Sequence, residues 1–307
     1  MRKIGLSTSS LQKLLNDDKK AIEIAAKAGA DAVDFWLRDD YCDNTFDYRR
    51  EGSLYSKSEE EIIEYFTDIK KHAENCGVFI CQTHGRGKGF INNKAEDDAL
   101  VKNARIDLLA TKILGAPVCV MHNATSIFLG ANPDPELMHK LSFDMFTRIL
   151  PYAKEYNIKL ATETFGDAVR YNSVDFFGDI NEFIKAYNDI KAIEEYKDYF
   201  TTCVDTGHSN KAMRFGNPTS ANVIRKIGSD ISVLHLDDND TLIDQHKPPM
   251  TGSIDWSDVM KALDEVGYSG VYNMELNLNC FGNELMFETA EFAVKIMRNL
   301  LKNYYRE

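Results

Sequence analysis

The sequence predicts a (β/α)8 barrel that forms a single domain over residues 1–307. Short apolar runs alternate eight times with longer amphipathic segments, and no Pro-, Ser- or Gly-rich linker divides the chain. Acids and imidazoles directly follow several of these runs, and barrel enzymes gather their active-site residues at that end of the strands. The alternative, an open doubly wound sheet, would need a glycine fingerprint near an early strand, and Gly85-Arg-Gly-Lys-Gly89 has the wrong spacing.

The first two units are recognised by their local patterns. A strand at 3–7 precedes a helix at 17–28, which Gly29 ends as a C-cap. A second strand at 31–37 leads into a long polar loop that runs to about residue 57. Ser58 then opens a helix by the capping-box pattern.

The remaining units repeat the same alternation, with a loop at 166–180. We expect further strands at 78–83, 117–121, 158–162, 199–204, 231–234 and 271–274. We expect further helices at 95–114, 134–156, 181–198, 219–227, 256–266 and 283–303.

The net charge, the apolar stretches and the cysteine positions indicate which partners and which compartment to expect. The net charge of -12 argues against a nucleic-acid partner, because such proteins usually carry a basic patch. No stretch approaches the roughly 20 apolar residues that span a bilayer, and the start of the chain does not resemble a signal peptide. The six cysteines are scattered, and Cys81, Cys119 and Cys203 lie in strand-like runs. We therefore expect a cytoplasmic protein with reduced thiols and no membrane contact.

Four polar residues follow four consecutive predicted strands: Glu163, Asp205, His235 and Glu275. The ends of parallel strands meet at one rim of a barrel, so these side chains should converge there. Three carboxylates and an imidazole suit a divalent metal ion, namely Mn, Mg, Co or Zn. A strand-end carboxylate that merely caps a helix is the alternative for each residue alone.

Further candidates lie near the same strand ends. His208 could be an outer metal ligand or orient a substrate hydroxyl, or it could be a surface histidine at a helix start. His84 and His122 end two more strands, and each is either a substrate contact or a satisfied rim histidine. Asp244 and His246 occupy an acidic loop after the seventh strand and are open to both interpretations.

Other polar and aromatic residues have weaker signals. Trp36 could stack on the apolar face of a sugar, although a core position is the alternative. Arg86 and Lys88 could hold a phosphate or carboxylate, but we expect a solvated basic loop. The acidic residues Asp237, Asp238 and Asp240 are expected to be solvated or to support the ligands.

With these residues identified, the chain resembles the xylose-isomerase-like barrel superfamily, which includes sugar isomerases, ketose 3-epimerases, inositol-catabolism enzymes and endonuclease IV. The segments that carry the resemblance are Glu163, Asp205-Thr-Gly-His208, His235-Leu-Asp-Asp-Asn-Asp240, Gly252-Ser-Ile-Asp-Trp256 and Glu275. The resemblance to the epimerases implies that Glu163, Asp205, His235 and Glu275 bind one cation, that Glu163 and Glu275 exchange protons with the substrate, and that His208 orients it. Val169 and Thr241 replace a Glu and an Arg that the ketose 3-epimerases share.

The resemblance to endonuclease IV implies a different use of the same rim. Its set of ligands for three metal ions is matched by His84, His122, Glu163, Asp205, His208, His235, Asp244, His246 and Glu275. Several sugar-specific relatives share most of these positions, so the match does not decide between the two activities.

The sequence therefore predicts a metal-dependent isomerase or epimerase of a small sugar or polyol, phosphorylated or not. Protons would transfer through a metal-stabilised enediolate, with Glu163 and Glu275 as acid and base. His208, His84, His122, Trp36 and His246 are the predicted substrate contacts. The alternatives are a dehydratase-type lyase of a keto-inositol and an apurinic-site endonuclease with a multinuclear zinc site. The resemblance also implies that the chain can form a homo-oligomer.

Overall fold

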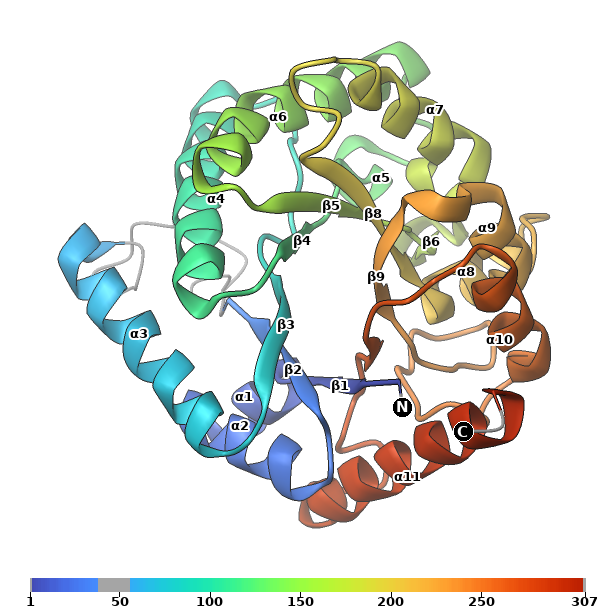
Figure 1. Ribbon diagram of the computed structural model, residues 1–307. Helices are drawn as coiled ribbons and strands as arrows, with labels where there is room; N and C mark the ends of the chain where they lie inside the picture. The colour runs from blue at the N-terminus through green and yellow to red at the C-terminus, as the bar shows by residue number, and fades with distance from the viewer. Residues whose placement is uncertain (1, 38–55, 306–307) are drawn as a thin grey trace.

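The computed structural model describes residues 2–37 and 56–305, and its eight-stranded parallel sheet curls into a barrel (Figure 1). The strands follow the order β10-β1-β2-β3-β4-β5-β8-β9. A parallel bridge between Leu236 and Met274 joins the two ends of this order, and the Leu236 amide donates to the Asn273 carbonyl at 2.9 Å. The predicted barrel is therefore confirmed. The strands are β1 (Ile4–Ser7), β2 (Ala32–Trp36), β3 (Phe79–His84), β4 (Val118–Met121), β5 (Lys159–Glu163), β8 (Phe200–Asp205), β9 (Ile231–His235) and β10 (Tyr272–Met274).

Helices surround the barrel (Figure 1). The expected capping box is present at α3, where the Ser58 hydroxyl accepts from the Glu61 amide and the Glu61 carboxylate accepts from the Ser58 amide. The predicted helices begin close to the expected residues, because N-caps and apolar periods are strong local signals. They are α2 (Asp18–Lys27), α3 (Glu59–Asn75), α4 (Lys94–Leu114), α6 (Pro135–Tyr156), α7 (Ile180–Lys191), α9 (Ser220–Ile227), α10 (Trp256–Glu265) and α11 (Met286–Tyr305).

Three short helices were not predicted: α1 (Ser9–Leu15), α5 (Ser126–Leu129) and α8 (Thr206–Met213). Each has eight residues or fewer. All three follow strands at the carboxyl-terminal rim. The expected loop 166–180 holds a small antiparallel hairpin, β6 (Asp167–Ala168) with β7 (Ser173–Val174), and the polar loop after β2 lies largely outside the described residues.

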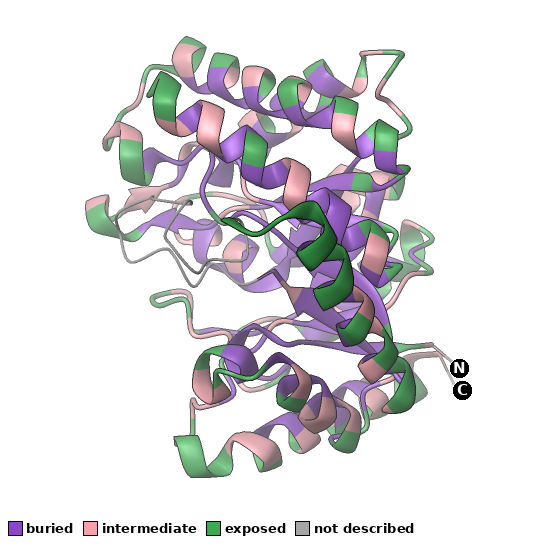
Figure 2. Cartoon of the chain, turned by 90° about the vertical axis from the view of Figure 1, so that its left-hand side faces the viewer, coloured by how far each residue is buried: buried purple, intermediate pink, exposed green. Residues whose placement is uncertain are grey.

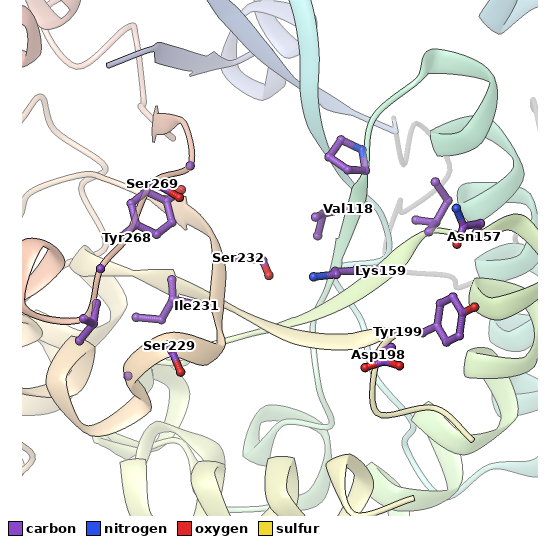
Figure 3. Close-up of a pocket in the computed structure, with 16 residues that line it drawn as sticks. Val118, Asn157, Lys159, Asp198, Tyr199, Ser229, Ile231, Ser232, Tyr268 and Ser269 are labelled. Carbon is purple, nitrogen blue, oxygen red and sulfur yellow. The ribbon is translucent and has the colours of Figure 1, made fainter. Parts of the chain in front are cut away.

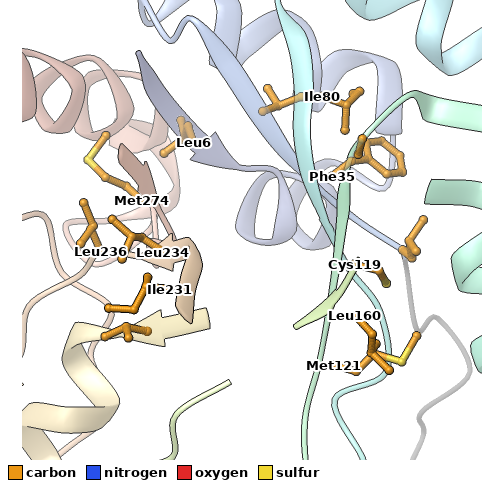
Figure 4. Packing of buried hydrophobic residues seen from close by; sticks show 14 of the residues in the cluster. Leu6, Phe35, Ile80, Cys119, Met121, Leu160, Ile231, Leu234, Leu236 and Met274 are labelled. Carbon is orange, nitrogen blue, oxygen red and sulfur yellow. The ribbon is translucent and has the colours of Figure 1, made fainter. Parts of the chain in front are cut away.

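The core has two layers. The larger layer lies between the strands and the surrounding helices, and its side chains include Leu6, Phe35, Leu160 and Met274 (Figure 4). Figure 2 shows the matching pattern on the helices, whose inward faces are buried and whose outward faces are exposed. The smaller layer is made of five buried residues from β4, β5, β8 and β9: Val118, Val120, Ala161, Cys203 and Val233.

Strand geometry connects the smaller core layer to the candidate site. Successive side chains of a strand point to opposite faces, so residues two apart share a face. Glu163 stands two residues after Ala161, Asp205 two after Cys203, and His235 two after Val233. The polar residues therefore form the next layer towards the carboxyl-terminal end of the barrel.

The helices and the cysteines bear on two further expectations. Over residues 2–37 and 56–305, every helix is too short or too polar to cross a bilayer. Cys81, Cys119 and Cys203 are buried free thiols, as expected, and Cys42 lies outside the described residues.

Candidate functional site

Glu163, the last residue of β5, lies at the centre of a cluster of imidazoles. Its side chain is 1% exposed, and Oε1 lies 2.9 Å from His235 Nδ1. Its other oxygen, Oε2, lies 3.3 Å from His84 Nε2 and 3.1 Å from His122 Nε2. The ends of β3, β4 and β9 thus direct their histidines at one carboxylate.

Glu275 joins this cluster from the end of β10. Its Oε2 lies 3.2 Å from His235 Nδ1, and its side chain is 16% exposed. On the opposite side of the ring, His235 Nε2 lies 3.1 Å from Asp34 Oδ2. Because an ionised carboxylate only accepts, Asp34 favours a proton on Nε2, and a cation bound between Glu163 and Glu275 would take the place of a proton on Nδ1.

Asp34 was not among the predicted site residues. It is fully buried on β2, where Oδ2 also accepts from the Asn273 amide at 3.1 Å and lies 3.3 Å from Gln82 Nε2. An acid within an apolar strand was the available signal, because a buried carboxylate needs donors or a cation.

Asp205 and His208 extend the cluster from β8 into α8. Asp205 Oδ1 accepts from the His208 amide at 2.6 Å and so caps the helix. The His208 ring donates from Nδ1 to the Thr164 carbonyl at 3.0 Å, so its other nitrogen, Nε2, is left for other partners. That nitrogen lies 3.4 Å from Asp244 Oδ2.

His246 completes a third group with His208 and Asp244. Its Nδ1 donates to the Glu275 carbonyl at 3.1 Å, and its Nε2 lies 3.2 Å from Asp244 Oδ2. Lys211 is buried beside this group, with Nζ 2.6 Å from Asp167 and 3.7 Å from Asp244 Oδ1. The loop after β9 therefore contributes ligand atoms to the same rim as the strands.

The spacing of these donors fits metal coordination. Metal–ligand distances of about 2.1 Å put neighbouring ligand atoms about 3.0–3.4 Å apart. Four overlapping sets at this rim have ligand atoms all within 4.8 Å of one another: His84/Glu163/His235/Glu275, His208/Asp244/His246, Glu163/Asp205/His208 and Asp205/His246/Glu275. The four predicted ligands are thus brought together, although in more than one set.

Two buried oxygens give an independent test of that fit. Glu163 Oε2 and Asp205 Oδ2 have no hydrogen-bond partner within the described part of the chain. The imidazoles near Glu163 Oε2 are within ion-pair distance but are not oriented to donate a hydrogen bond. A buried carboxylate oxygen without a donor is costly, and a cation would satisfy it.

Burial and charge shift the pKa values of these groups in opposite directions. Burial alone would raise the pKa of Glu163, but the His235 and His122 imidazoles hold it well below its ordinary value. Burial alone would lower the pKa of His235, but the surrounding negative charge raises it well above its ordinary value. Burial raises the pKa of Asp237 well above its usual range, and Asp205 adds to the rise. The cluster is therefore rich in negative charge that requires positive partners.

Several expectations about neighbouring residues were wrong or only partly right. Arg86 and Lys88 do not form a solvated loop: both are buried, and they pair with acids of α4, Asp107 at 3.2 Å and Glu96 at 2.9 Å. The sequence interpretation missed this because those acids follow the loop on a helix.

The acidic run after β9 divides into three roles. Asp237 is buried and accepts from the Gly207 amide at 2.8 Å, while its Oδ2 lies 3.4 Å from His246 Nδ1. Asp238 is buried and accepts from the Trp256 indole at 2.8 Å, so it supports the fold. Asp240 is exposed, as expected for a solvated group.

Trp36 lies at the end of β2, half-buried, outside all four ligand sets. The Lys13 ammonium stands 4.8 Å from the centre of its ring. Trp36 therefore lies against a cation at the rim, and its direct contact with a sugar stays a prediction.

Two pockets lie at opposite ends of the barrel. A pocket of about 280 Å³ adjoins the cluster and is lined by Asp244, His246 and Glu275 together with Ser9, Ser10 and Lys13 of α1. A larger pocket of about 550 Å³ opens at the amino-terminal rim, beside Lys159, Tyr199 and Tyr268 (Figure 3). None of the predicted site residues lines the larger pocket.

Known proteins resemble this chain in sequence and in fold. Two uncharacterized proteins are similar in sequence: y4fM of Sinorhizobium fredii is 28% identical over 178 residues, and MJ1311 of Methanocaldococcus jannaschii is 27% identical over 189 residues. The matched stretches cover 57% and 60% of this chain. They cover only 51% and 60% of those two relatives.

Solved structures match over almost the whole chain. A D-tagatose 3-epimerase-like protein has a TM-score of 0.75 at 21% identity, covering 99% of this chain and 98% of its own. A D-psicose 3-epimerase has a TM-score of 0.69 at 16% identity, covering 97% and 99%. An IolI protein with a bound zinc atom has a TM-score of 0.69 at 18% identity, covering 98% and 99%. At these identities the matches show a shared fold.

The family comparison is more direct. The model of the xylose isomerase-like TIM barrel family matches residues 22–296, which include every strand from β2 to β10 and all the ligand sets. The closed barrel and the strand-end acids and histidines are the features on which the resemblance in sequence depended. The chain belongs to the xylose isomerase-like TIM barrel family.

Proposed function

We propose that this protein is a metal-dependent isomerase or epimerase of a small polyhydroxy carbonyl compound. The observation that carries the proposal is the convergence of the Glu163 and Glu275 carboxylates on His235 Nδ1, at 2.9 and 3.2 Å. Two solved structures of the same fold, named for D-tagatose and D-psicose 3-epimerases, support the choice of a sugar substrate. The adjoining pocket of about 280 Å³ suits a small molecule.

Glu163, His235, Glu275 and Asp205 would hold the cation, as the sequence predicts. Mn, Mg, Co and Zn all remain candidates, since the donors mix carboxylate oxygens with imidazole nitrogens. When bound, such a cation supplies Lewis acidity, which makes a carbon-bound proton next to a carbonyl easier to remove.

The protein's own groups would carry the proton. Burial opposes ionisation, but attraction from the imidazoles lowers the pKa values of Glu163 and Glu275, so both are ionised at neutral pH and have a free oxygen lone pair for a proton. Return of the proton to the opposite face of the same carbon would epimerise the substrate, and return to the neighbouring carbon would isomerise it. His208 stands beside Glu163, with Nδ1 3.5 Å from Oε1, and would orient a substrate hydroxyl.

The test is a deuterium-exchange screen of ketoses, aldoses and inososes with the metal-loaded protein in heavy water. We expect exchange at the carbon next to the carbonyl, with a changed configuration or carbonyl position in the product. Glu163→Gln and Glu275→Gln should each lower turnover by at least about a hundredfold, the usual contribution of a positioned acid or base. Metal content should fall as well, since each would lose a ligand.

A matched control is Glu182→Gln, because Glu182 also pairs with a histidine, His139 at 2.7 Å, but on the outer helices. It should leave metal content and turnover unchanged. Full exchange activity in Glu163→Gln would overturn the proposal. Loss of water from a cyclic polyol, detected by mass spectrometry, would point instead to a lyase.

A second candidate is phosphodiester cleavage at abasic DNA, favoured by one observation. The ligand sets contain eight of the nine residues that the resemblance to endonuclease IV implies, including the His208/Asp244/His246 group, and the ninth, His122, lies 3.1 Å from Glu163 Oε2. Three metal ions per chain together with nicking of an abasic duplex would support cleavage. The net charge of -12 weighs against a polyanionic substrate, so we rank this candidate second.

A further inference from the structure

The pocket beside the ligand cluster has two chemically different walls. Asp244, His246 and Glu275 form the wall that belongs to the cluster. Ser9, Ser10 and Lys13 also line the pocket, and all three come from α1, the short helix after β1. A molecule in this pocket would therefore meet both the candidate ligands and an ammonium with two hydroxyls.

Lys13 differs from the other cations near this rim. Arg86, Lys88 and Lys211 are buried and each faces a carboxylate at 3.2 Å or less. Lys13 is exposed, and among residues 2–37 and 56–305 no carboxylate lies within ion-pair distance of it. The Trp36 ring, 4.8 Å away, favours the ammonium in this position without neutralising it.

The two serines are buried and held by neighbours that leave their hydroxyl hydrogens available. Ser9 Oγ accepts from the Ser7 hydroxyl at 3.2 Å, and Ser10 Oγ accepts from the Leu278 amide at 3.0 Å. Within the described part of the chain neither hydroxyl has an acceptor. Each can therefore donate to a group in the pocket at little cost in ordering.

We infer that Lys13, Ser9 and Ser10 form a phosphate subsite, so that the substrate is a phosphorylated sugar or polyol. This inference rests on the proposed function and narrows its substrate class. A phosphate monoester offers several strong acceptor oxygens to the ammonium and the hydroxyls. The same charge is repelled by Asp244 and Glu275, so the phosphate would turn away from the cluster and direct the carbonyl end towards it.

The test compares pairs of substrates that differ only in the phosphate, such as fructose with fructose 6-phosphate and ribulose with ribulose 5-phosphate. We expect the metal-loaded protein to favour the phosphorylated member by at least tenfold in kcat/KM. Lys13→Met should reduce that ratio about tenfold, the loss expected for one charged hydrogen bond, and Lys13→Arg should restore most of it. Lys20→Met, an exposed lysine of α2, is the control and should leave the ratio unchanged.

Calorimetric titration of the same variants with the phosphorylated sugars separates this inference from the proposed function. Tighter binding of the phosphorylated sugars that depends on Lys13, without deuterium exchange in any sugar, would support the subsite and contradict the isomerase. Exchange with equal preference for both members of each pair, unaffected by Lys13→Met, would overturn the subsite and leave the isomerase standing. A Lys13-dependent preference for carboxylated sugars alone would overturn the phosphate assignment.

Discussion

The two rims of the barrel differ in how their polar groups are satisfied. At the amino-terminal rim, the Thr201 hydroxyl donates to the Asp230 carbonyl at 2.7 Å, and the Tyr268 hydroxyl donates to the Val271 carbonyl at 2.8 Å. At the carboxyl-terminal rim, Glu163 Oε2, Asp205 Oδ2 and Asp237 Oδ2 are buried without a hydrogen-bond partner in the described chain. These two hydroxyls of the first rim have partners within the chain, whereas the three carboxylate oxygens of the second need something that the polypeptide does not supply.

Of the two pockets at the ends of the barrel, the larger lies at the rim without the candidate ligands. The amino-terminal pocket has about 550 Å³ and the carboxyl-terminal one about 280 Å³. The larger pocket is lined mostly by strand starts and turns, while the smaller one is lined by three candidate ligands. Unsatisfied donors and acceptors are therefore the better guide to chemistry here, as expected when barrel strands end in active-site residues.

Metal removal should produce the largest difference between the rims. Dialysis against a chelator should abolish turnover and lower the unfolding temperature, because the buried carboxylates would then repel one another. A site loaded to 100 times its dissociation constant contributes about 2.7 kcal/mol, or about 4 °C for a chain of this size. Scanning calorimetry before and after reloading measures it. An unchanged unfolding temperature and full activity in the chelated protein would contradict a metal site at this rim.

Asp34→Ala should have the next largest effect. The mutation removes the carboxylate that orients His235 from 3.1 Å, without touching the ligand atoms themselves. Loss of such a supporting group typically weakens metal affinity by about 10- to 100-fold. Competition with a chromogenic chelator measures the affinity, and Asp34→Asn should retain part of it. Wild-type affinity in Asp34→Ala would mean that His235 does not depend on this contact.

Much of the fold could be predicted from the sequence because its signals are local. All eight strands begin within one residue of the expected position, since buried parallel strands appear as continuous apolar runs. The rim positions of Glu163, Asp205, His235 and Glu275 followed from the same runs. The short helix α1 did not, and with it the wall of Ser9, Ser10 and Lys13 was missed.

The residues that sequence reasoning misjudged depend on distant partners. The role of Asp34 depends on its contact with His235, which is 201 residues away in the chain. Arg86 was expected to be solvated, but in the fold its guanidinium lies 3.2 Å from the Asp107 carboxylate. Hydropathy and residue spacing carry information about neighbours along the chain, so they could not predict side-chain contacts between distant elements.

Thr201→Val tests the amino-terminal rim and should have a smaller effect. It removes a buried hydroxyl that lies 2.7 Å from the Asp230 carbonyl and 2.6 Å from the Ser232 hydroxyl. We expect a loss of about 1 kcal/mol in unfolding free energy, as for one intramolecular hydrogen bond, and no change in turnover. Urea denaturation and the exchange assay measure the two quantities. A mutation at this rim that changed turnover but not stability would break the division between the rims.

Lys159→Met should have the smallest effect of the series. Lys159 is exposed at the start of β5 and lines the larger pocket, four residues before Glu163 on the same strand. Surface substitutions of this kind usually change stability by no more than about 0.5 kcal/mol. Metal content and kcat/KM should match the wild type, because the smaller core layer, with Ala161 between the two residues, separates the pocket from the ligands. A fall in kcat/KM would show that the large pocket takes part in the reaction, and the rim of unsatisfied carboxylates would then be only half of the functional site.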